Sequence, residues 1–580
     1  MGPSGAGKTT LLNRLVGRGI TGEVTGSITY SGQPLQNARS GIGYVTQDDI
    51  MYETLTPREN LSFAASFLQG HASAAQKKEA VEAVLRKLRL VKCADTVVGI
   101  PGLVKGISGG ERKRTNVALS LLSNPHLLLL DEPTSGLDSK MADELMTDVS
   151  DVAKNGCTAV ATIHQPSEAV FSRFKKVLLL ESGHIAYYGQ VQGLRDMLSQ
   201  IGFQMSSGMV PLPEILLDIL EAPKDVAADV HSKRLADLKT RSIKPNANDG
   251  SPVGKIEVAD RLNFPRQLAL LFKRNFLAFR RNKVLTIART MQSIMSSVLI
   301  GWIFVQVDKD LDGVNVRVFG AFLLAFAQFL FAILGVVNTF PQEKAVFLRE
   351  AQDRWYHPAA FYLAKVLLDT ILQCFFPIIV TCIGYFMIGL NTDKAERVFI
   401  FYLFLALLSN CGAAIGFIVS AAVSSVSTAL SIVPGLVMPQ LVLSGLFIPV
   451  KDMPQPFNAL SHVVLARYAL QGVITNEFIC ETDAKCTAAY HMVSGCDDSP
   501  CDFCCTSEQF ASAGGLCPII TCDQALIRAN LDGDSIWPSG DENIDTVWYN
   551  MLCLVVLLVF FRSVGLVSLL MSYRRASKSG

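Results

Sequence analysis

Six apolar stretches recur in the second half of the chain, and each is long enough to cross a bilayer as a helix, which takes about 20 residues. They lie at residues 285–306, 319–341, 360–389, 398–422, 429–450 and 547–572. Hydrophobic residues make up 50% of the sequence and charged residues 18%, which favours a membrane protein. The alternative is six buried helices of a soluble protein, but no soluble core needs so many in a row. The sequence therefore predicts an all-α membrane domain of six spans.

Basic residues set the predicted orientation of these spans. They precede the first span, separate the second from the third and follow the last: Lys273, Arg274, Arg280, Arg281, Lys283, Lys344, Arg349, Arg354, Arg574, Arg575 and Lys578. With six spans, all three groups lie on one side, and positive charge marks the cytosol. The loop at 451–546 is then expected outside. Within it, residues 457–478 are apolar, and we interpret them as a partly re-entrant or interfacial helix pair.

One charged residue, Arg562, lies inside the last predicted span. A charge at the centre of a membrane helix costs about 2.5–3.5 kcal/mol on insertion scales. Because Arg562 is about ten residues from the cytosolic end, its side chain is poorly placed to extend to the interface. We therefore predict a functional or interhelical partner for its guanidinium.

Eight of the 14 cysteines are concentrated in the predicted external loop. They are Cys480, Cys486, Cys496, Cys501, Cys504, Cys505, Cys517 and Cys522. An even number of cysteines in a short stretch indicates disulfides and an oxidising compartment, in agreement with the predicted topology. A zinc site is the alternative, because Cys501 and Cys504 have the two-residue spacing of a metal-binding knuckle. The sequence does not select a pairing.

The first 221 residues have a different pattern, in which short apolar runs alternate with amphipathic helical stretches. Runs of strand length lie at residues 41–45, 127–130, 157–163 and 176–180. Short apolar runs joined through helices predict an α/β domain whose parallel sheet is covered on both faces. Residues 222–262 are polar and contain Pro245, so we predict a linker there.

A glycine-rich segment opens the α/β domain. Residues Gly2–Thr9 fit the pattern G-x-x-x-x-G-K-[ST], in which glycines let backbone N–H groups surround phosphate oxygens at the start of a helix. Lys8 is expected to reach the β- and γ-phosphates of ATP, and the Thr9 hydroxyl to bind Mg²⁺. The predicted nucleotide-binding residues of this segment are Gly2, Ser4, Gly5, Gly7, Lys8, Thr9 and Thr10. The alternative is an ordinary glycine-rich turn.

A second candidate segment is the apolar run Leu127–Leu130, which ends in two carboxylates. Asp131 is placed to hold Mg²⁺, directly or through water, and Glu132 is the candidate general base for the attacking water. The alternative is a strand that merely ends in an acidic loop.

A third segment, Ser108–Gly109–Gly110, opens a predicted helix and forms a second anion-binding turn. Two phosphate sites in one domain make sense if two copies face each other. With this set the sequence resembles the nucleotide-binding domain of ABC transporters, in which Ser108, Gly109 and Gly110 would form the signature that completes the partner's ATP site. The following residues Glu111–Arg114 resemble the G subfamily, the White and sterol/multidrug half-transporters.

The resemblance extends to three further motifs in family order. Gln47 resembles the Q-loop glutamine that senses Mg²⁺ and couples to the membrane domain. Asp138 lies in a segment similar to the D-loop, and His164 resembles the switch histidine on the γ-phosphate. The family thus implies Glu132, His164 and Gln47 as catalytic residues and Thr9, Gln47 and Asp131 as Mg²⁺ ligands. A structural role is the alternative for the histidine.

The membrane half also resembles the G subfamily, in which the nucleotide-binding domain comes first. Residues 263–284 resemble its connecting helix, which precedes the six-span domain at 285–573. By position, Phe331 resembles a cavity-lining phenylalanine, and Leu446 and Phe447 belong to a segment similar to the plug that closes the cavity. Ordinary packing against lipid or helices is the alternative for these residues.

The resemblance implies ATP-driven export of amphipathic or lipid-like molecules, such as sterols or xenobiotics, with ATP and Mg²⁺ as cofactors. It implies a dimer with a second copy or a related half-transporter, a cytosolic nucleotide-binding domain and a multi-pass position in a membrane, with the plasma membrane favoured. The alternative function is an ATPase subunit that regulates or remodels a membrane partner without transport. The net charge of +1 gives no reason to expect a nucleic-acid partner.

The phosphate-binding segment lies unusually close to Met1. Such a loop normally follows a buried strand, and only Met1 precedes Gly2. The first strands of the family domain and its adenine-stacking aromatic residue are not found ahead of the loop. We therefore expect the natural start of the protein to lie upstream of Met1.

Overall fold

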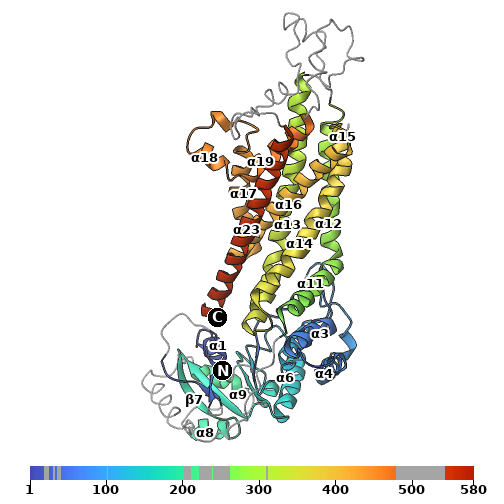
Figure 1. The fold of residues 1–580 in the computed structure, drawn as a ribbon. Coiled ribbons are helices and arrows are strands. Elements are labelled where there is room, and N and C mark those ends of the chain that lie inside the picture. Colours follow the sequence, from blue (N-terminus) through green and yellow to red (C-terminus); the bar gives the residue numbers. More distant parts are fainter. Residues whose placement is uncertain are drawn as a thin grey trace, which may run out of the picture. The chain divides into compact units, whose positions relative to one another are not determined.

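The computed structural model describes residues 1–18, 25–30, 33–35, 41–100, 102–200, 211–220, 238, 262–307, 311–392, 394–448, 450–478 and 543–579. The chain forms two compact units (Figure 1). The N-terminal unit comprises Met1–Leu270, Ala345–Ala360 and Tyr573–Gly580, and the helical unit comprises Leu271–Lys344 and Phe361–Ser572. The predicted linker at 222–262 and the eight clustered cysteines lie almost wholly outside the described residues.

The N-terminal unit alternates strands and helices, as its sequence predicts. Its strands are β1 (Thr29–Tyr30), β2 (Gln33–Pro34), β3 (Ile42–Val45), β4 (Leu127–Leu130), β5 (Thr158–Ala161), β6 (Lys176–Glu181) and β7 (His184–Gln190). Its helices are α1 (Lys8–Val16), α3 (Pro57–Leu68), α4 (Ala74–Lys87), η2 (Val91–Cys93), α5 (Gly109–Leu121), α6 (Ser139–Lys154), α7 (Glu168–Phe171), α8 (Leu194–Gln200) and α9 (Leu212–Leu220).

The centre of this unit is a parallel sheet in the order β3-β4-β5. Val45 is paired with Leu130, and Leu130 with Ala161, so the three strands end side by side. Leu128, Leu129 and Leu130 are fully buried, which explains why β4 is a continuous apolar run. The prediction of a parallel sheet is confirmed for these strands.

The fourth predicted strand, β6, pairs differently from the expectation. It forms an antiparallel hairpin with β7, in which Glu181 is paired with His184. Only Ser182 and Gly183 connect the two strands, and both have a positive φ, of 46° and 83°. Two successive residues in this conformation form a tight hairpin turn that suits the twist of antiparallel strands. The local turn chemistry therefore decides the pairing.

Side-chain caps fix where several helices of the N-terminal unit begin, among them α3, α5 and α6. Thr56 accepts a hydrogen bond from the backbone N–H of Glu59 at the start of α3, and Pro57 supplies the fixed φ suited to a first helical position. Ser108 caps α5, and Asp138 caps α6 by accepting from the N–H groups of Lys140 and Met141. Each cap satisfies backbone donors that have no partner inside the helix.

The helical unit is built from long apolar helices (Figure 1). The elements in chain order are α11 (Phe264–Arg281), α12 (Lys283–Ile303), α13 (Leu311–Gln352), α14 (Pro358–Val380), η3 (Thr381–Tyr385), α15 (Phe386–Ile388), α16 (Ala395–Ala422), α17 (Val426–Val442), η4 (Val450–Asp452), α18 (Phe457–Ser461), α19 (Leu465–Phe478) and α23 (Asn543–Ser579). The N-terminal unit includes the first residues of α11 and α14 and the last residues of α13 and α23.

Apolar helices coincide with all six predicted spans. Five are long and apolar enough to cross a membrane: Lys283–Ile303, Asn315–Gln352, Pro358–Ile388, Ala395–Ala422 and Val547–Ser577. The sixth, α17, is a shorter apolar helix of 17 residues that covers only residues 429–442 of the predicted span at 429–450. Helices α18 and α19 lie where a helix pair is predicted, at 457–478. The orientation of these helices in a membrane stays a prediction.

Close packing of α13 against α16 forms the core of the helical unit. A Cβ added to Gly412 would lie 2.6 Å from the carbonyl oxygen of Phe329, and one added to Gly416 would lie 2.8 Å from that of Ile333. Small residues at such crossings let two helix backbones approach closely, as in membrane helix pairs. Buried aromatic residues, among them Phe401 and Phe404, fill the surrounding core.

Two buried cations form ion pairs among these apolar helices. Lys365 on α14 contacts Glu343 on α13 at 2.9 Å and Asp369 at 3.2 Å, and Arg317 contacts Glu477 at 2.9 Å. Charges so deeply buried are tolerated only when they are paired. The pair Arg317–Glu477 connects helices whose paired residues are 160 positions apart in the sequence, which the apolar pattern alone does not predict.

Arg562 differs from these paired cations. Its two terminal guanidinium nitrogens are buried and have no hydrogen-bond partner in the part of the chain that the structure describes. Its backbone carbonyl accepts a hydrogen bond from the Tyr362 hydroxyl. Within this unit, the predicted interhelical contact thus involves the backbone of Arg562, and its guanidinium is left without the partner we expected.

Lys365 and Arg562 offer a matched comparison of a paired and an unpaired buried cation. We expect Lys365→Met to lower the stability of the protein in detergent by about 3–5 kcal/mol, because Glu343 and Asp369 would lose their partner. Arg562→Met should leave the melting temperature unchanged or raise it, since no ion pair is lost. Thermal melts of both purified variants test this. Equal destabilisation would show that Arg562 has a partner of its own.

Candidate functional site

The glycine-rich segment forms a loop that leads into α1. Gly7 has a φ of 93°, which glycine adopts without strain, and the first turn of α1 follows at Lys8. The backbone N–H of Leu180 on β6 donates to the Met1 carbonyl at 2.9 Å, so the loop begins beside β6. A Cβ added to Gly2 would lie 2.3 Å from the Leu180 carbonyl oxygen. This position therefore requires glycine for close approach to the strand.

The side chain of Lys8 folds back into this loop. Its ammonium donates to the Gly2 carbonyl at 2.8 Å and to the Pro3 carbonyl at 2.9 Å. Burial lowers the pKa of Lys8, while the negative charges of Glu132 and Asp131 act in the opposite direction. Phosphate oxygens are stronger acceptors for an ammonium than neutral carbonyls. The loop is thus built to accept an anion in place of its own carbonyls.

Asp131 connects the loop to the sheet. It follows β4 directly and is only 2% exposed. One of its carboxylate oxygens accepts hydrogen bonds from Thr9 at 3.1 Å and from Thr162 at 2.6 Å. A threonine hydroxyl beside a carboxylate is the set of oxygen ligands that Mg²⁺ takes next to bound phosphates.

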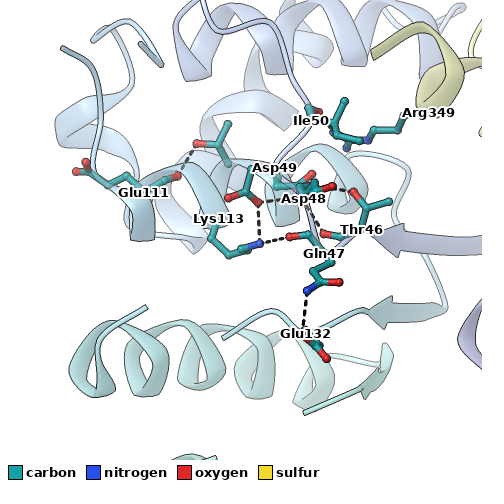
Figure 2. Close-up of polar contacts among 11 residues, drawn as sticks. Thr46, Gln47, Asp48, Asp49, Ile50, Glu111, Lys113, Glu132 and Arg349 are labelled. Carbon is teal, nitrogen blue, oxygen red and sulfur yellow. Dashed lines mark hydrogen bonds and ion pairs between the residues drawn. The ribbon is translucent and has the colours of Figure 1, made fainter. Parts of the chain in front are cut away.

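Glu132, the next residue, has a strained backbone. Its φ is 44°, which costs a residue other than glycine about 1–3 kcal/mol. Its N–H donates to the Thr162 hydroxyl at 2.9 Å, and its carboxylate accepts from the Gln47 side chain at 3.0 Å (Figure 2). Strain that is maintained by surrounding contacts is typical of functional sites.

Other predicted residues make no described hydrogen bond to this group. Ser108 and Gly109 are exposed at the start of α5, where the Ser108 hydroxyl and the Glu111 carboxylate form a reciprocal cap. Asp138 caps α6, and His164 is half-buried in the loop after β5. Among the described residues, no hydrogen bond joins any of these predicted residues to the loop at 2–10. Thr10 is exposed on α1, and Ser4 and Gly5 lie in the loop.

The predicted substrate-cavity residues lie in the helical unit. Phe331 is half-buried on α13, Leu446 packs against the core of the unit, and Phe447 is 56% exposed. No ring contact joins Phe331 to Phe447 within the described ranges. Their assignment to a cavity stays a prediction.

Thr162 is a site residue that the sequence analysis missed. Its buried hydroxyl donates to Asp131 and accepts from the N–H of Glu132, so it holds both carboxylate residues in place. Its position directly after the strand at 158–161 was the available signal, because parallel strands end at the same edge of a sheet.

The residues present fit a bound Mg²⁺–ATP. The loop supplies Lys8 and the amides at the start of α1 for phosphate oxygens, and Thr9 and Asp131 supply two oxygens for the metal. No group of three or more His, Cys, Asp or Glu residues that could hold a metal by itself occurs in the described segments. A metal at Thr9 and Asp131 would therefore share its coordination with phosphate and water, as Mg²⁺ commonly does.

Comparisons with known proteins agree with this fold. Residues 1–135 match the family model of the ABC transporter, and residues 266–478 match that of the ABC-2 type transporter. A P-loop ATPase followed by apolar membrane helices defines an ATP-driven membrane transporter.

Three curated relatives place the chain more closely. It is 32% identical to Protein white of Drosophila melanogaster over 82% of this chain and 72% of that protein. It is 30% identical to ABC transporter G family member 7 of Arabidopsis thaliana over 82% of this chain and 69% of that protein. It is 28% identical to the broad substrate specificity ATP-binding cassette transporter ABCG2 of Bos taurus over 98% of this chain and 87% of that protein. The chain belongs to the ABC transporter family, in its G subfamily of half-transporters.

Membership confirms the predicted fold class and the predicted enzyme class. The N-terminal unit contains an ABC-type ATPase that binds ATP. Hydrolysis of this ATP drives transport by a multi-pass membrane domain.

Thr162 gives a test of how the site holds its metal. We expect Thr162→Val to raise the Mg²⁺ concentration needed for half-maximal ATPase activity about 10–100-fold, because Asp131 loses the hydroxyl that orients it. Thr162→Ser keeps the hydroxyl and should stay close to the unchanged protein. Thr147→Val is a matched control, since among the described residues the Thr147 hydroxyl bonds the Asp143 carbonyl within α6 alone. An unchanged Mg²⁺ requirement in Thr162→Val would contradict this role.

Proposed function

We propose that this chain exports amphipathic or lipid-like molecules as one half of a dimer, formed with a second copy or with a related half-transporter. The observation that carries the proposal is an exposed second anion-binding turn that makes no described hydrogen bond to the phosphate-binding loop of its own chain. No described hydrogen bond connects the Lys8 loop with the Ser108 turn, and Ser108 and Gly109 are exposed. Two chains facing each other would complete both ATP sites.

The Ser108 turn has the chemistry to contact a phosphate of the partner's ATP. It begins the 13-residue helix α5, whose first N–H groups carry partial positive charge. Burial would raise the pKa of Glu111, but hydrogen bonds from the Ser108 N–H and hydroxyl outweigh it and hold that pKa below its ordinary value. The cap therefore stays formed at neutral pH and keeps the turn in shape.

Within one site, each residue has a separate task. Bound Mg²⁺–ATP supplies the γ-phosphoryl group and a metal charge that neutralises developing negative charge. Lys8 binds the phosphates, while Thr9 and Asp131 hold the metal, with Gln47 as a further ligand. Glu132 accepts the proton of the attacking water. His164 donates to the γ-phosphate from the loop after β5.

The surface of α12 supports a position of this helix in lipid, the phase in which a lipophilic substrate would dissolve. Ile287, Met295, Leu299 and Trp302 on α12 are each more than half exposed, which suits contact with lipid. The Bos taurus relative is described as having broad substrate specificity. Phe331, Leu446 and Phe447 are the residues that we propose for the substrate cavity and its outer closure.

The remaining assignments follow from the predicted topology. The proposed membrane is the plasma membrane, with the ATPase in the cytosol and residues 451–546 outside. The eight clustered cysteines, which lie beyond the described residues, are proposed to form disulfides there. Masses of proteolytic peptides from residues 480–522, compared before and after reduction, distinguish disulfides from free or zinc-bound thiols.

Glu132→Gln tests the proposed general base. We expect ATP turnover to fall about 10²–10⁴-fold, because the amide cannot accept the proton, while ATP binding is retained. The exposed Asp151→Asn on α6 is a matched control that should hydrolyse normally. Steady-state hydrolysis and binding of a fluorescent ATP analogue give the two measurements. Unchanged hydrolysis in Glu132→Gln would refute the assignment.

Reconstituted vesicles test transport itself. The purified protein, in vesicles with the ATPase facing outwards, should accumulate a labelled lipid or amphipathic dye when ATP is added. The Glu132→Gln protein, which we expect to bind ATP without turnover, serves as the negative control. ATP hydrolysis without uptake by any dimer would refute the exporter and favour a regulatory ATPase subunit.

A further inference from the structure

The loop at residues 46–50, which carries Gln47, is held by the signature helix α5 (Figure 2). The Lys113 ammonium donates to the Gln47 carbonyl at 2.7 Å and contacts the Asp49 carboxylate at 3.0 Å. Lys113 is 4% exposed. A buried ammonium needs such partners, because an unpaired one would be strongly destabilising.

Asn116, one turn further along α5, binds the same loop. Its side-chain NH₂ lies 3.4 Å from the Thr46 carbonyl, 3.3 Å from the Asp48 carbonyl and 3.1 Å from the Asp49 carboxylate. Both side chains lie on one face of the helix, as residues three apart do. The loop is thus fixed to α5 through both its backbone and its acidic side chain.

The far side of the loop contacts two other groups. The Gln47 side chain donates to Glu132 at 3.0 Å, and Arg349 donates to the Ile50 carbonyl (Figure 2). Arg349 belongs to the segment Ala345–Ala360 of the same N-terminal unit. Lys113 therefore acts on Glu132 through one intermediate residue.

Helix α5 connects this loop with the exposed turn that begins at Ser108. Lys113 lies five residues after Ser108, which is about 7.5 Å along a rigid helix. A displacement of the Ser108 turn therefore moves Lys113, and with it Gln47. In the proposed dimer, that turn contacts the ATP bound by the partner's loop.

We infer that Lys113 is a positioning residue that sets Gln47 and Glu132 of its own chain according to whether that chain's Ser108 turn has engaged the opposite ATP. This inference rests on the proposed dimer.

Mixed dimers with one hydrolytic site separate this role from a merely structural one. Two differently tagged chains are co-purified, and one carries Glu132→Gln, so that only the other chain's Glu132 is active. Lys113→Met is then placed either in the chain with the active Glu132 (cis) or in the Glu132→Gln chain (trans). In trans, the altered helix is the one that supplies the Ser108 turn to the hydrolysing site.

We expect the cis dimer to show at least a tenfold lower kcat than the mixed dimer with Lys113 intact, with KM for ATP changed less than threefold. The trans dimer should retain at least half of the reference rate. Lys113→Arg in cis should recover part of the loss. Lys154→Met, which removes an exposed lysine of α6, is the matched control and should have no effect.

Two outcomes overturn the inference. One is an equal rate in the cis and trans dimers, and the other is a loss in trans alone, which would mean that Lys113 only shapes the Ser108 turn. Should Lys113→Met not fold, Asn116→Ala removes bonds to the same loop and must give the same difference between cis and trans. Failure to recover any dimer would refute the proposed function instead.

Discussion

The parallel register of β3, β4 and β5 is the constraint on which the ATP site depends. Because Val45, Leu130 and Ala161 are paired across the sheet, the residues that follow them emerge at one edge. Those residues are the loop of Gln47, the pair Asp131–Glu132, and Thr162. A parallel ladder holds its strands by evenly spaced backbone bonds, so the separation of these side chains is set before any of them interact. The phosphate loop contributes Thr9 to the same edge.

Short contiguous motifs made most of this site predictable. The loop at 2–9 and the carboxylates at 131 and 132 each need neighbouring residues in a fixed order, which a single sequence records directly. Thr162 and Lys113 carry no such local signature. Thr162 acts through contacts with residues 30 and 31 positions away, and Lys113 bonds a carbonyl 66 positions away. Such roles depend on strand and helix placement and become visible only in the fold.

In the helical unit, too, some features can be predicted from the sequence and others are visible only in the fold. Hydropathy places its spans well, because the bilayer requires long apolar helices. It does not indicate that Lys365 is paired with Glu343 and Asp369, since the partners come from different turns and helices. Arg562 shows how far the free-energy cost of placing a charge in a membrane helix can be used for prediction. Its position in a span led us to expect a partner, yet its guanidinium nitrogens have none among the described residues. The free-energy cost of burying a charge can be inferred from the sequence, but the group that pairs with that charge cannot.

Helix α5 combines a local sequence motif with contacts to residues that are distant in the sequence. Its first turn is exposed and has the composition of a motif, whereas its next turns bury Lys113, Thr115 and Asn116. Polar residues in a buried helix face gain little stability over well-packed apolar ones. They can, however, fix the direction of a neighbouring backbone, which apolar contacts do not. The bonds from Lys113 and Asn116 are directed at the loop that carries Gln47, so the polarity of this face is best explained by positioning rather than by stability.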